Sequence, residues 1–185
     1  MGELPPDALP TSPAGLRDHH ATIFVPWETA RDVERARSQW DPVMAERIAA
    51  HVTLIYPEEA PSLDLLVERL RDAGRTHGPF RLGLGDLACF ERPERGVYVG
   101  VEDLEGGYRR LRADVLRPPF RPHAFPPHVT VVHPHTSLRG RECWDDPAPR
   151  AWPRREFTVT ELTITGFDGV RWTVVDRFSL GQGGR

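Results

Sequence analysis

Two histidine–threonine pairs are the residues of this sequence best placed to do chemistry. The phrase His-Val-Thr-Leu-Ile-Tyr-Pro begins at His51, and His-Val-Thr-Val-Val-His-Pro begins at His128. In a strand, successive side chains point to opposite faces, so His51 and Thr53 share one face. The same holds for His128 and Thr130. Two such strands, brought together, would surround one small anion with two imidazoles and two hydroxyls.

This set of side chains suits acid–base chemistry at a phosphate. Cleavage of a phosphodiester removes a proton from the attacking water and protonates the leaving oxygen. Imidazole titrates near a pH of about 6.5, so one histidine can accept a proton while the other donates one. Threonine hydroxyls can donate hydrogen bonds to the non-bridging oxygens, where charge builds. Nothing in this scheme requires a metal, and the sequence leaves open which histidine is the acid.

A third pair, His20 and Thr22, tests the specificity of the signal. Chance gives about half of one such triplet in a chain of this composition, so a single copy means little. His20 has no partner at the spacing of 77 residues that separates His51 from His128. We therefore interpret His20 as a histidine at the start of a strand and set it aside.

The same offset of 77 residues extends over most of the chain. It places Phe80 on Phe157 and Phe90 on Phe167. We therefore expect a strand–helix–strand–helix–strand unit that occurs twice, with a last strand appended. The two units cover about residues 20–95 and 96–180 of one bilobed domain, residues 19–180. Ligand sites commonly lie in the groove between such halves.

Local patterns predict the elements that would position these residues. Three segments have the composition and apolar spacing of helices: residues 28–40, 62–75 and 104–117. Seven segments have the pattern of strands: residues 20–26, 50–56, 80–90, 96–101, 127–133, 157–167 and 170–180. Residues 137–153 are predicted to be mostly loop. The last two strands would form a hairpin around Asp168-Gly169. The fold class is therefore α+β.

Two His-x-Thr strands in a duplicated α+β chain resemble the 2H phosphoesterase superfamily. The nearest branch is the 2′–5′ RNA ligase-like group with its RNA 2′,3′-cyclic phosphodiesterases. The resemblance covers about residues 20–180 and implies two mainly antiparallel sheets around a central cleft, with helices outside. It implies acid–base roles for His51 and His128 and phosphate binding by Thr53 and Thr130. It also implies metal-independent cleavage of a cyclic 2′,3′-type or 2′–5′ phosphodiester of RNA or a nucleotide.

The two phrases differ in polar character at one place, the fifth position after each motif histidine. Tyr56 stands there in the first copy and His133 in the second, where many members of the branch carry a basic residue. Strand alternation would turn both side chains away from the catalytic pair unless the strand ends there. We predict that these two residues contribute to substrate binding and choice.

Basic residues are concentrated between residues 109 and 155, where ten arginines face four acids. Every basic residue in the chain besides histidine is an arginine, which excludes a lysine nucleophile. Arg121, Arg139 and Arg141 flank the second phrase and are candidates for phosphate contacts. The alternative is that they are solvated loop arginines.

Two further sets of residues invite a functional interpretation. Phe24, Trp27, Phe125 and Trp152 could stack a base, although core packing is the alternative for each. Four histidines lie close together in the sequence: His123, His128, His133 and His135. Their spacing does not match a zinc motif, and prolines intervene. We predict no metal and no cofactor.

Composition indicates a soluble protein with one domain of 185 residues, 39% hydrophobic and with a net charge of −3. No apolar run approaches the roughly 20 residues of a membrane span. The two cysteines give neither a disulfide framework nor a metal spacing, so we expect a cytoplasmic protein. Residues 1–18 are rich in proline and lack the apolar core of a signal peptide. We expect flexible tails at residues 1–18 and 181–185.

The expected partner is an RNA terminus or a small nucleotide with a cyclic phosphate, with no membrane and no obligate protein partner. The competing hypothesis is a non-catalytic module that binds a nucleotide or an RNA end in the same cleft. Both copies of the phrase are intact, which favours the enzyme. The sequence does not distinguish hydrolase from ligase direction, and it does not identify the native substrate.

Overall fold

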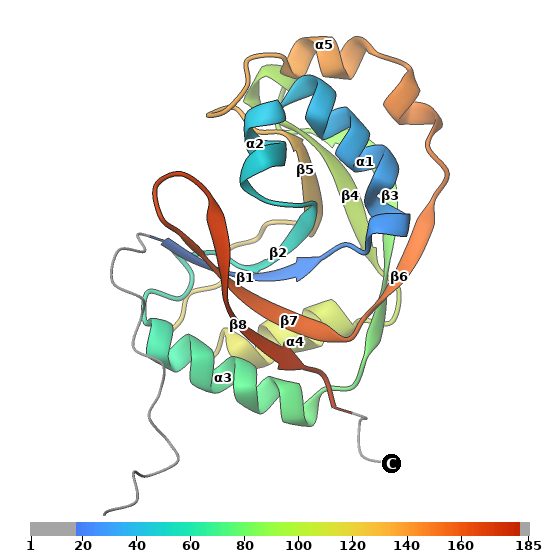
Figure 1. The fold of residues 1–185 in the computed structure, drawn as a ribbon. Coiled ribbons are helices and arrows are strands. Elements are labelled where there is room, and N and C mark those ends of the chain that lie inside the picture. The colour runs from blue at the N-terminus through green and yellow to red at the C-terminus, as the bar shows by residue number, and fades with distance from the viewer. Residues whose placement is uncertain (1–17, 182–185) are drawn as a thin grey trace, which may run out of the picture.

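The computed structural model describes residues 18–181, without the side chains of residues 150 and 151. In this part of the chain two four-stranded antiparallel sheets meet where β2 and β5 are in contact (Figure 1). The first sheet has the order β2-β1-β7-β8 and the second the order β5-β4-β3-β6. The strands are β1 (Asp18–Phe24), β2 (His51–Ile55), β3 (Phe80–Cys89), β4 (Val97–Asp103), β5 (His128–Val132), β6 (Arg155–Val159), β7 (Glu161–Phe167) and β8 (Trp172–Ser179). The predicted tails lie outside the described residues, apart from Asp18 and Gly181.

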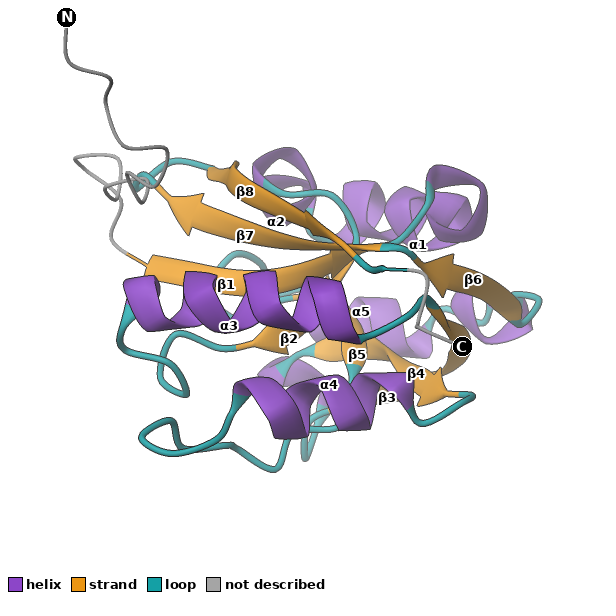
Figure 2. Cartoon of the chain, turned by 90° about the horizontal axis from the view of Figure 1, so that it is seen from below, coloured by secondary structure: helices purple, strands orange, loops and turns teal. Residues whose placement is uncertain are grey.

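Helices cover the outer sides of both sheets. They are α1 (Trp27–Trp40), α2 (Pro42–Arg47), α3 (Leu63–Thr76), α4 (Gly107–Val115) and α5 (Gly140–Asp145), with 3-10 turns η1 (Pro93–Arg95) and η2 (Ala148–Ala151). Helices α3 and α4 lie side by side, and α3 packs on the first sheet (Figure 2). Helices α1 and α5 pack on the second sheet. Among the described residues, none of the helices has the length and apolar character needed to cross a bilayer.

The α+β fold with two antiparallel sheets and outer helices is confirmed. Residues 137–153, expected to be mostly loop, instead contain α5 and η2. Helix α2 was not predicted either. The Asp41-Pro42 pair ends α1, as expected, yet α2 begins there directly. The Asp41 side chain accepts a hydrogen bond from the Met44 N–H at 3.1 Å and so caps the new helix. Proline is well tolerated at the first position of a helix, where its missing N–H costs nothing. A pair that stops one helix therefore starts the next.

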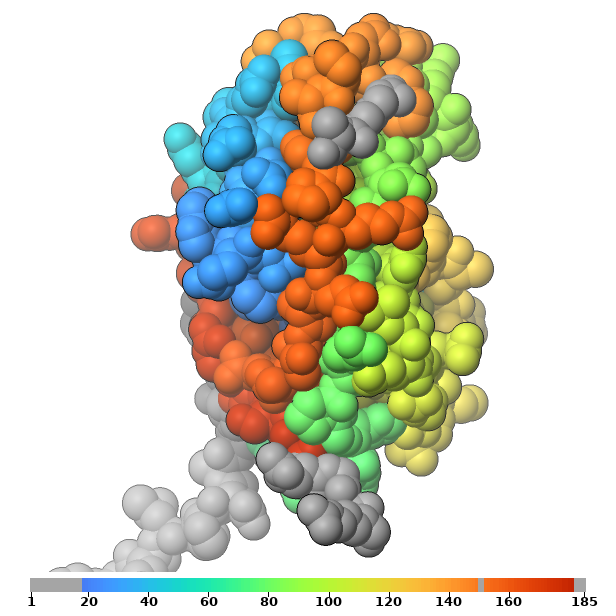
Figure 3. All heavy atoms as spheres, turned by 90° about the vertical axis from the view of Figure 1, so that its right-hand side faces the viewer, coloured from blue at the N-terminus to red at the C-terminus, as the bar shows by residue number. Residues whose placement is uncertain are grey.

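The single strand predicted for residues 157–167 is wrong, because this segment forms two strands in different sheets. Strand β6 pairs with β3 in the second sheet, whereas β7 pairs with β1 and β8 in the first. Figure 3 shows this orange segment running down one side of the molecule beside the blue helix α1. The apolar alternation is almost continuous across the break, so local pattern does not reveal the change of sheet.

Each sheet combines strands from both halves of the sequence. Strand β3 belongs to the first half but pairs with β4 in the second sheet. Its counterpart at the repeat offset, residues 157–166, is divided between β6, which stays in the second sheet, and β7, which pairs with β1 in the first. The two sheets therefore do not coincide with the two halves of the chain.

The two motif strands, β2 and β5, are edge strands, so one side of each backbone lacks a neighbouring strand. Buried polar groups left without partners are costly, and side chains from other elements supply them here. In β2, the Tyr108 hydroxyl donates to the Thr53 carbonyl oxygen at 3.0 Å, and the Arg112 guanidinium donates to that of Leu54. Both donors lie on α4, in the other half of the chain.

A buried carboxylate fixes the exit of each motif strand. Glu59 accepts the Tyr56 N–H at 2.9 Å and pairs with Arg112 at 2.5 Å, with its side chain fully buried. At the equivalent place in the second copy, Asp41 accepts the His133 N–H at 2.9 Å. Asp41 belongs to the first half and His133 to the second. Each half therefore helps to hold the motif strand of the other.

Replacing Glu59 by alanine is expected to lower the free energy of unfolding by about 3–5 kcal/mol, because the buried Arg112 charge would lose its partner. Denaturant unfolding would measure this loss. The control is Glu161→Ala, which removes an exposed ion pair with Arg177 and should cost about 0–1 kcal/mol. Equal, small losses in both variants would contradict a structural role for the Glu59–Arg112 pair.

Candidate active site

A cavity of about 460 Å³ lies where the two sheets meet, and it contains both His-x-Thr pairs. Its size is within the range of about 300–1,000 Å³ that small-molecule sites usually have. Among the residues that line it are His51, Thr53, His128 and Thr130 of the two motif strands, with Tyr56 and His133 directly after these strands. The structure therefore brings the four predicted catalytic residues together with both residues predicted to influence substrate choice.

A bulge in each motif strand explains why Tyr56 and His133 also reach the cavity. Thr53 lies opposite Thr22, but the next paired residue of β2 is Ile55, which leaves Leu54 as an extra residue. The same irregularity follows Thr130 in β5, where Val131 is the extra residue. One extra residue reverses the alternation of side chains beyond it. The side chains after the bulge therefore return to the face of the histidine and threonine.

Both motif histidines are held in the same orientation by a backbone carbonyl two residues earlier. His51 Nδ1 lies 2.8 Å from the Ala49 oxygen, and His128 Nδ1 lies 2.8 Å from the Pro126 oxygen. A carbonyl oxygen only accepts, so Nδ1 must carry the proton in each ring. This leaves Nε2 of both rings as the nitrogen that can exchange a proton with a ligand.

The environment of the two histidines favours their neutral forms. The pKa of His51 is lowered to about 4, mainly by burial and also by the charges of Arg37 and of a protonated His128, against the hydrogen bond to Ala49. Burial also lowers the pKa of His128, against the hydrogen bond to Pro126. Both imidazoles are therefore neutral near pH 7 until a nearby anion stabilises their protonated forms.

The cavity walls carry more positive than negative groups. Arg37, Arg47 and Arg95 line it, whereas Asp18 is the only acid among the described residues that line it. The Arg37 guanidinium is buried, pairs with Glu34 at 2.9 Å and donates to the Ile48 carbonyl oxygen at 2.7 Å. It thus holds the chain that leads into β2. This balance of charge favours an anionic ligand.

Two more histidines of the cavity differ from the motif pair. His20, set aside on the repeat offset, lines the cavity and stacks on Trp172 with ring centroids 4.2 Å apart. The pKa of His20 is lowered to about 3, mainly by burial and also by the positive charges of protonated His51 and His19. His133 Nδ1 accepts the His135 N–H at 3.2 Å, so its neutral ring carries the proton on Nε2. His133 is therefore a neutral hydrogen-bond donor.

The flanking arginines predicted to contact phosphate do not line the cavity. Arg139 lies over the Trp40 ring, 4.5 Å from its centroid, and donates to the Gln39 carbonyl oxygen at 2.9 Å. The backbone N–H of Arg121 donates to the Glu59 carbonyl oxygen at 3.1 Å. Arg141 pairs with Glu94 at 3.0 Å. The arginines that do line the cavity were not singled out, although Arg47 lies only four residues before His51.

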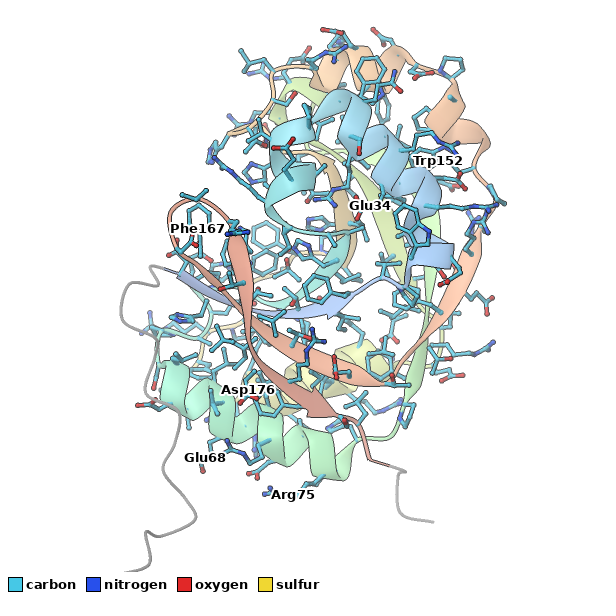
Figure 4. The ribbon with its side chains drawn as sticks, viewed as in Figure 1. Glu34, Glu68, Arg75, Trp152, Phe167 and Asp176 are labelled. Carbon is cyan, nitrogen blue, oxygen red and sulfur yellow. The ribbon has the colours of Figure 1, made fainter. Side chains whose placement is uncertain are left out.

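Of the four aromatic residues considered for base stacking, Phe125 alone lines this cavity. Phe24 and Trp27 line a separate one. Trp152 lies on the opposite side of the molecule from Phe167 (Figure 4). Phe167 and Trp172, which do line the cavity, were missed although they flank the predicted hairpin turn. Within residues 18–181, no cluster of three or more histidine, cysteine or acidic side chains is arranged to hold a metal ion.

Comparison with known proteins agrees with this arrangement. A family model described as the 2′-5′ RNA ligase superfamily matches residues 25–171. The solved structure of E. coli LigT complexed with ATP is 22% identical, with a TM-score of 0.64 over 91% of this chain and 100% of that chain. E. coli LigT complexed with 3′-AMP is 20% identical, with a TM-score of 0.62 over 90% and 99% of the two chains.

A bacterial protein of different origin has the same fold. The protein TT0787 of Thermus thermophilus is 21% identical, with a TM-score of 0.58 over 91% of this chain and 100% of that chain. No curated protein sequence matches the chain. At these identities the structural likeness establishes the fold and leaves the chemistry to be argued from the site.

We expect His51→Asn to make the stability of the protein less dependent on pH. His51 has a pKa of about 4 in the folded state against 6.5 for an ordinary histidine, so the unfolded state binds the proton first as the pH falls. The lowered pKa corresponds to a contribution of up to about 3 kcal/mol to the free energy of unfolding. This contribution is fully present above about pH 6.5 and is lost as the pH falls towards about 4. Urea unfolding at pH 7 and pH 5 would measure the difference.

The control for this measurement is His123→Asn, since the His123 side chain is exposed. That variant should lose as much stability between pH 7 and pH 5 as the wild type. If His51→Asn shows the same loss as well, the lowered pKa of His51 is not supported.

Proposed function

The chain belongs to the 2′-5′ RNA ligase superfamily, among the 2H phosphoesterases, and on this premise we propose that it is a phosphodiesterase. Its substrate is a cyclic 2′,3′-type or 2′–5′ phosphodiester of RNA or of a nucleotide, cleaved without a metal. The observation that carries the proposal is the single cavity lined by both His-x-Thr pairs. The solved complexes of E. coli LigT with ATP and with 3′-AMP support a nucleotide as the ligand of this fold.

The surroundings of the two imidazoles support different roles for them. The buried guanidinium of Arg37 opposes a positive charge on His51, and none of the cations that the structure describes acts on His128 in the same way. His51 is therefore the general base, whose Nε2 takes a proton from the attacking water. His128 is the general acid, and the phosphodiester anion bound beside it favours its protonated form.

The step is a displacement at phosphorus in which atoms and charges balance. The water oxygen forms a bond to phosphorus while its proton passes to His51. The bond from phosphorus to one ribose oxygen breaks, and that oxygen receives the proton of His128. A cyclic phosphate becomes a phosphomonoester, and exchange with water resets both imidazoles. The two roles require two groups on different sides of the phosphate, which is what one histidine from each sheet provides.

The hydroxyls and the two strand-exit residues supply neutral donors to the phosphate. Thr53 and Thr130 lie beside the histidines on the cavity face of their strands. Tyr56 and His133 lie just beyond them, and the His133 Nε2–H can donate without carrying a charge. Donors fixed before the reaction stabilise the charge that builds on the non-bridging oxygens.

Replacing either His51 or His128 by alanine is expected to lower kcat by about 10²–10⁴-fold, since each removes a proton-transfer group. The measurement is hydrolysis of adenosine 2′,3′-cyclic phosphate with a chelator present throughout. His77→Ala is the control, because His77 pairs with Asp114 and lines a different cavity, so its turnover should equal that of the wild type.

Two results would overturn the mechanism: turnover that the chelator abolishes, and turnover that persists in both histidine variants. Tight binding of the cyclic nucleotide without hydrolysis would instead indicate a non-catalytic nucleotide-binding module.

Replacing Thr130 by valine is expected to lower kcat by about 10²–10³-fold with a smaller effect on KM, because the hydroxyl acts mainly as charge builds in the transition state. Thr130→Ser keeps the hydroxyl and should retain most of the activity. Steady-state kinetics on the same cyclic nucleotide would show both effects. Equal losses in the valine and serine variants would mean that the methyl group, and not the hydroxyl, is what the site needs.

A further inference from the structure

The end of the β7–β8 hairpin forms an aromatic wall of the cavity that the proposed chemistry does not use. This wall consists of Phe167, the last residue of β7, and Trp172, the first of β8. The two residues are paired directly across the hairpin, and their ring centroids lie 5.2 Å apart at an angle of 32°. Figure 4 shows Phe167 near the tip of the hairpin. Both residues line the cavity that holds the motif histidines.

Contacts on two sides fix the orientation of this wall. The Asp168 carboxylate accepts the N–H groups of Val170 and Arg171 at 2.8 and 2.9 Å, which closes the hairpin turn. The Trp172 ring stacks on His20 with an angle of 25° between the planes. Because His20 is neutral, it acts here as a flat aromatic support. The wall is therefore preorganised in the absence of ligand.

The wall is continuous with the catalytic part of the cavity. His20, behind Trp172, contacts Tyr56 edge to face, with ring centroids 6.3 Å apart. His20 lies opposite Thr165, which shares a face of β7 with Phe167. Thr22, two residues further along the same face of β1, lies opposite Thr53. One face of the first sheet thus carries both the catalytic threonine and the aromatic wall.

A cation stands beside the wall. The Arg47 guanidinium carbon lies 6.0 Å from the centroid of the Phe167 ring. Arg47 lines the cavity and forms no ion pair with any residue that the structure describes. A half-buried aromatic surface next to a cation without an acidic partner fits a flat, uncharged ring attached to an anion. A nucleotide has this combination.

We propose that Phe167 and Trp172 form a platform on which the active site stacks the base of its substrate. The base belongs to the nucleotide whose phosphate lies between His51 and His128. This inference rests on the proposed function in taking that phosphate to be part of a nucleotide. Stacking of a base on aromatic side chains contributes about 1–3 kcal/mol, which corresponds to about 5–150-fold in affinity.

The test is equilibrium binding of two phosphomonoesters by calorimetry, with adenosine 2′-phosphate compared with ribose 2-phosphate, which lacks the base. The wild type should bind the nucleotide at least about fivefold more tightly. In Trp172→Leu, which keeps apolar volume but has no ring, this advantage should fall to about twofold or less, with the affinity for ribose 2-phosphate unchanged. Trp172→Phe should restore most of it. Trp27→Leu is the matched control, because Trp27 is 67% exposed and lines another cavity.

Three results would overturn the platform: no advantage of the nucleotide in the wild type, an advantage that Trp172→Leu retains, or an equal loss of affinity for both ligands. Because the experiment measures binding, its outcome does not depend on whether the protein hydrolyses a cyclic phosphate. A wild type that hydrolyses no cyclic phosphate but prefers the nucleotide through Trp172 would refute the proposed function and leave the platform standing.

Discussion

The geometry of the cavity depends on how two edge strands complete their backbone hydrogen bonds. Strands β2 and β5 have no neighbour on the side where the sheets meet, so buried side chains must satisfy their polar groups. Glu59, with Arg112, does this for the exit of β2, and Asp41 does it for the exit of β5. Since Arg112 and Asp41 each act on the strand of the other half, the position of one histidine depends on the folding of both halves.

The same burial determines the electrostatics of the site. Taking the imidazoles out of water lowers the pKa of both motif histidines. Among the described residues that line the cavity, arginines outnumber acids. Such a site is poorly suited to a cation, whereas the charge of a bound phosphate would stabilise the protonated form of one histidine, which takes its proton from solvent. In the proposed mechanism, substrate binding and activation of the acid are therefore coupled through one electrostatic effect.

The duplicated scaffold keeps equivalent parts near the reaction and differs further away. Each motif strand has the same carbonyl under its histidine and the same bulge after its threonine. Beyond the bulge, the first copy has Tyr56 where the second has His133. The aromatic wall of Phe167 and Trp172 belongs to the first sheet only. The proposed substrate, held between two similar histidines, would therefore meet unlike surroundings on its two sides, which would give it a preferred direction.

The sequence by itself determined which side chains are the candidates for the chemistry and that they share a strand face. Alternation is a local property, so the faces of His51 and Thr53 follow from their spacing, and the repeat offset identified their partners. The tertiary structure decided the rest: which sheet takes each third strand, that His20 joins the cavity, and that Tyr56 and His133 turn towards it. These features depend on pairing with strands far away in the chain, where β3 and β7 have similar local patterns. Local pattern indicates that a strand forms and which face is apolar, but its neighbour is selected only when the whole core packs.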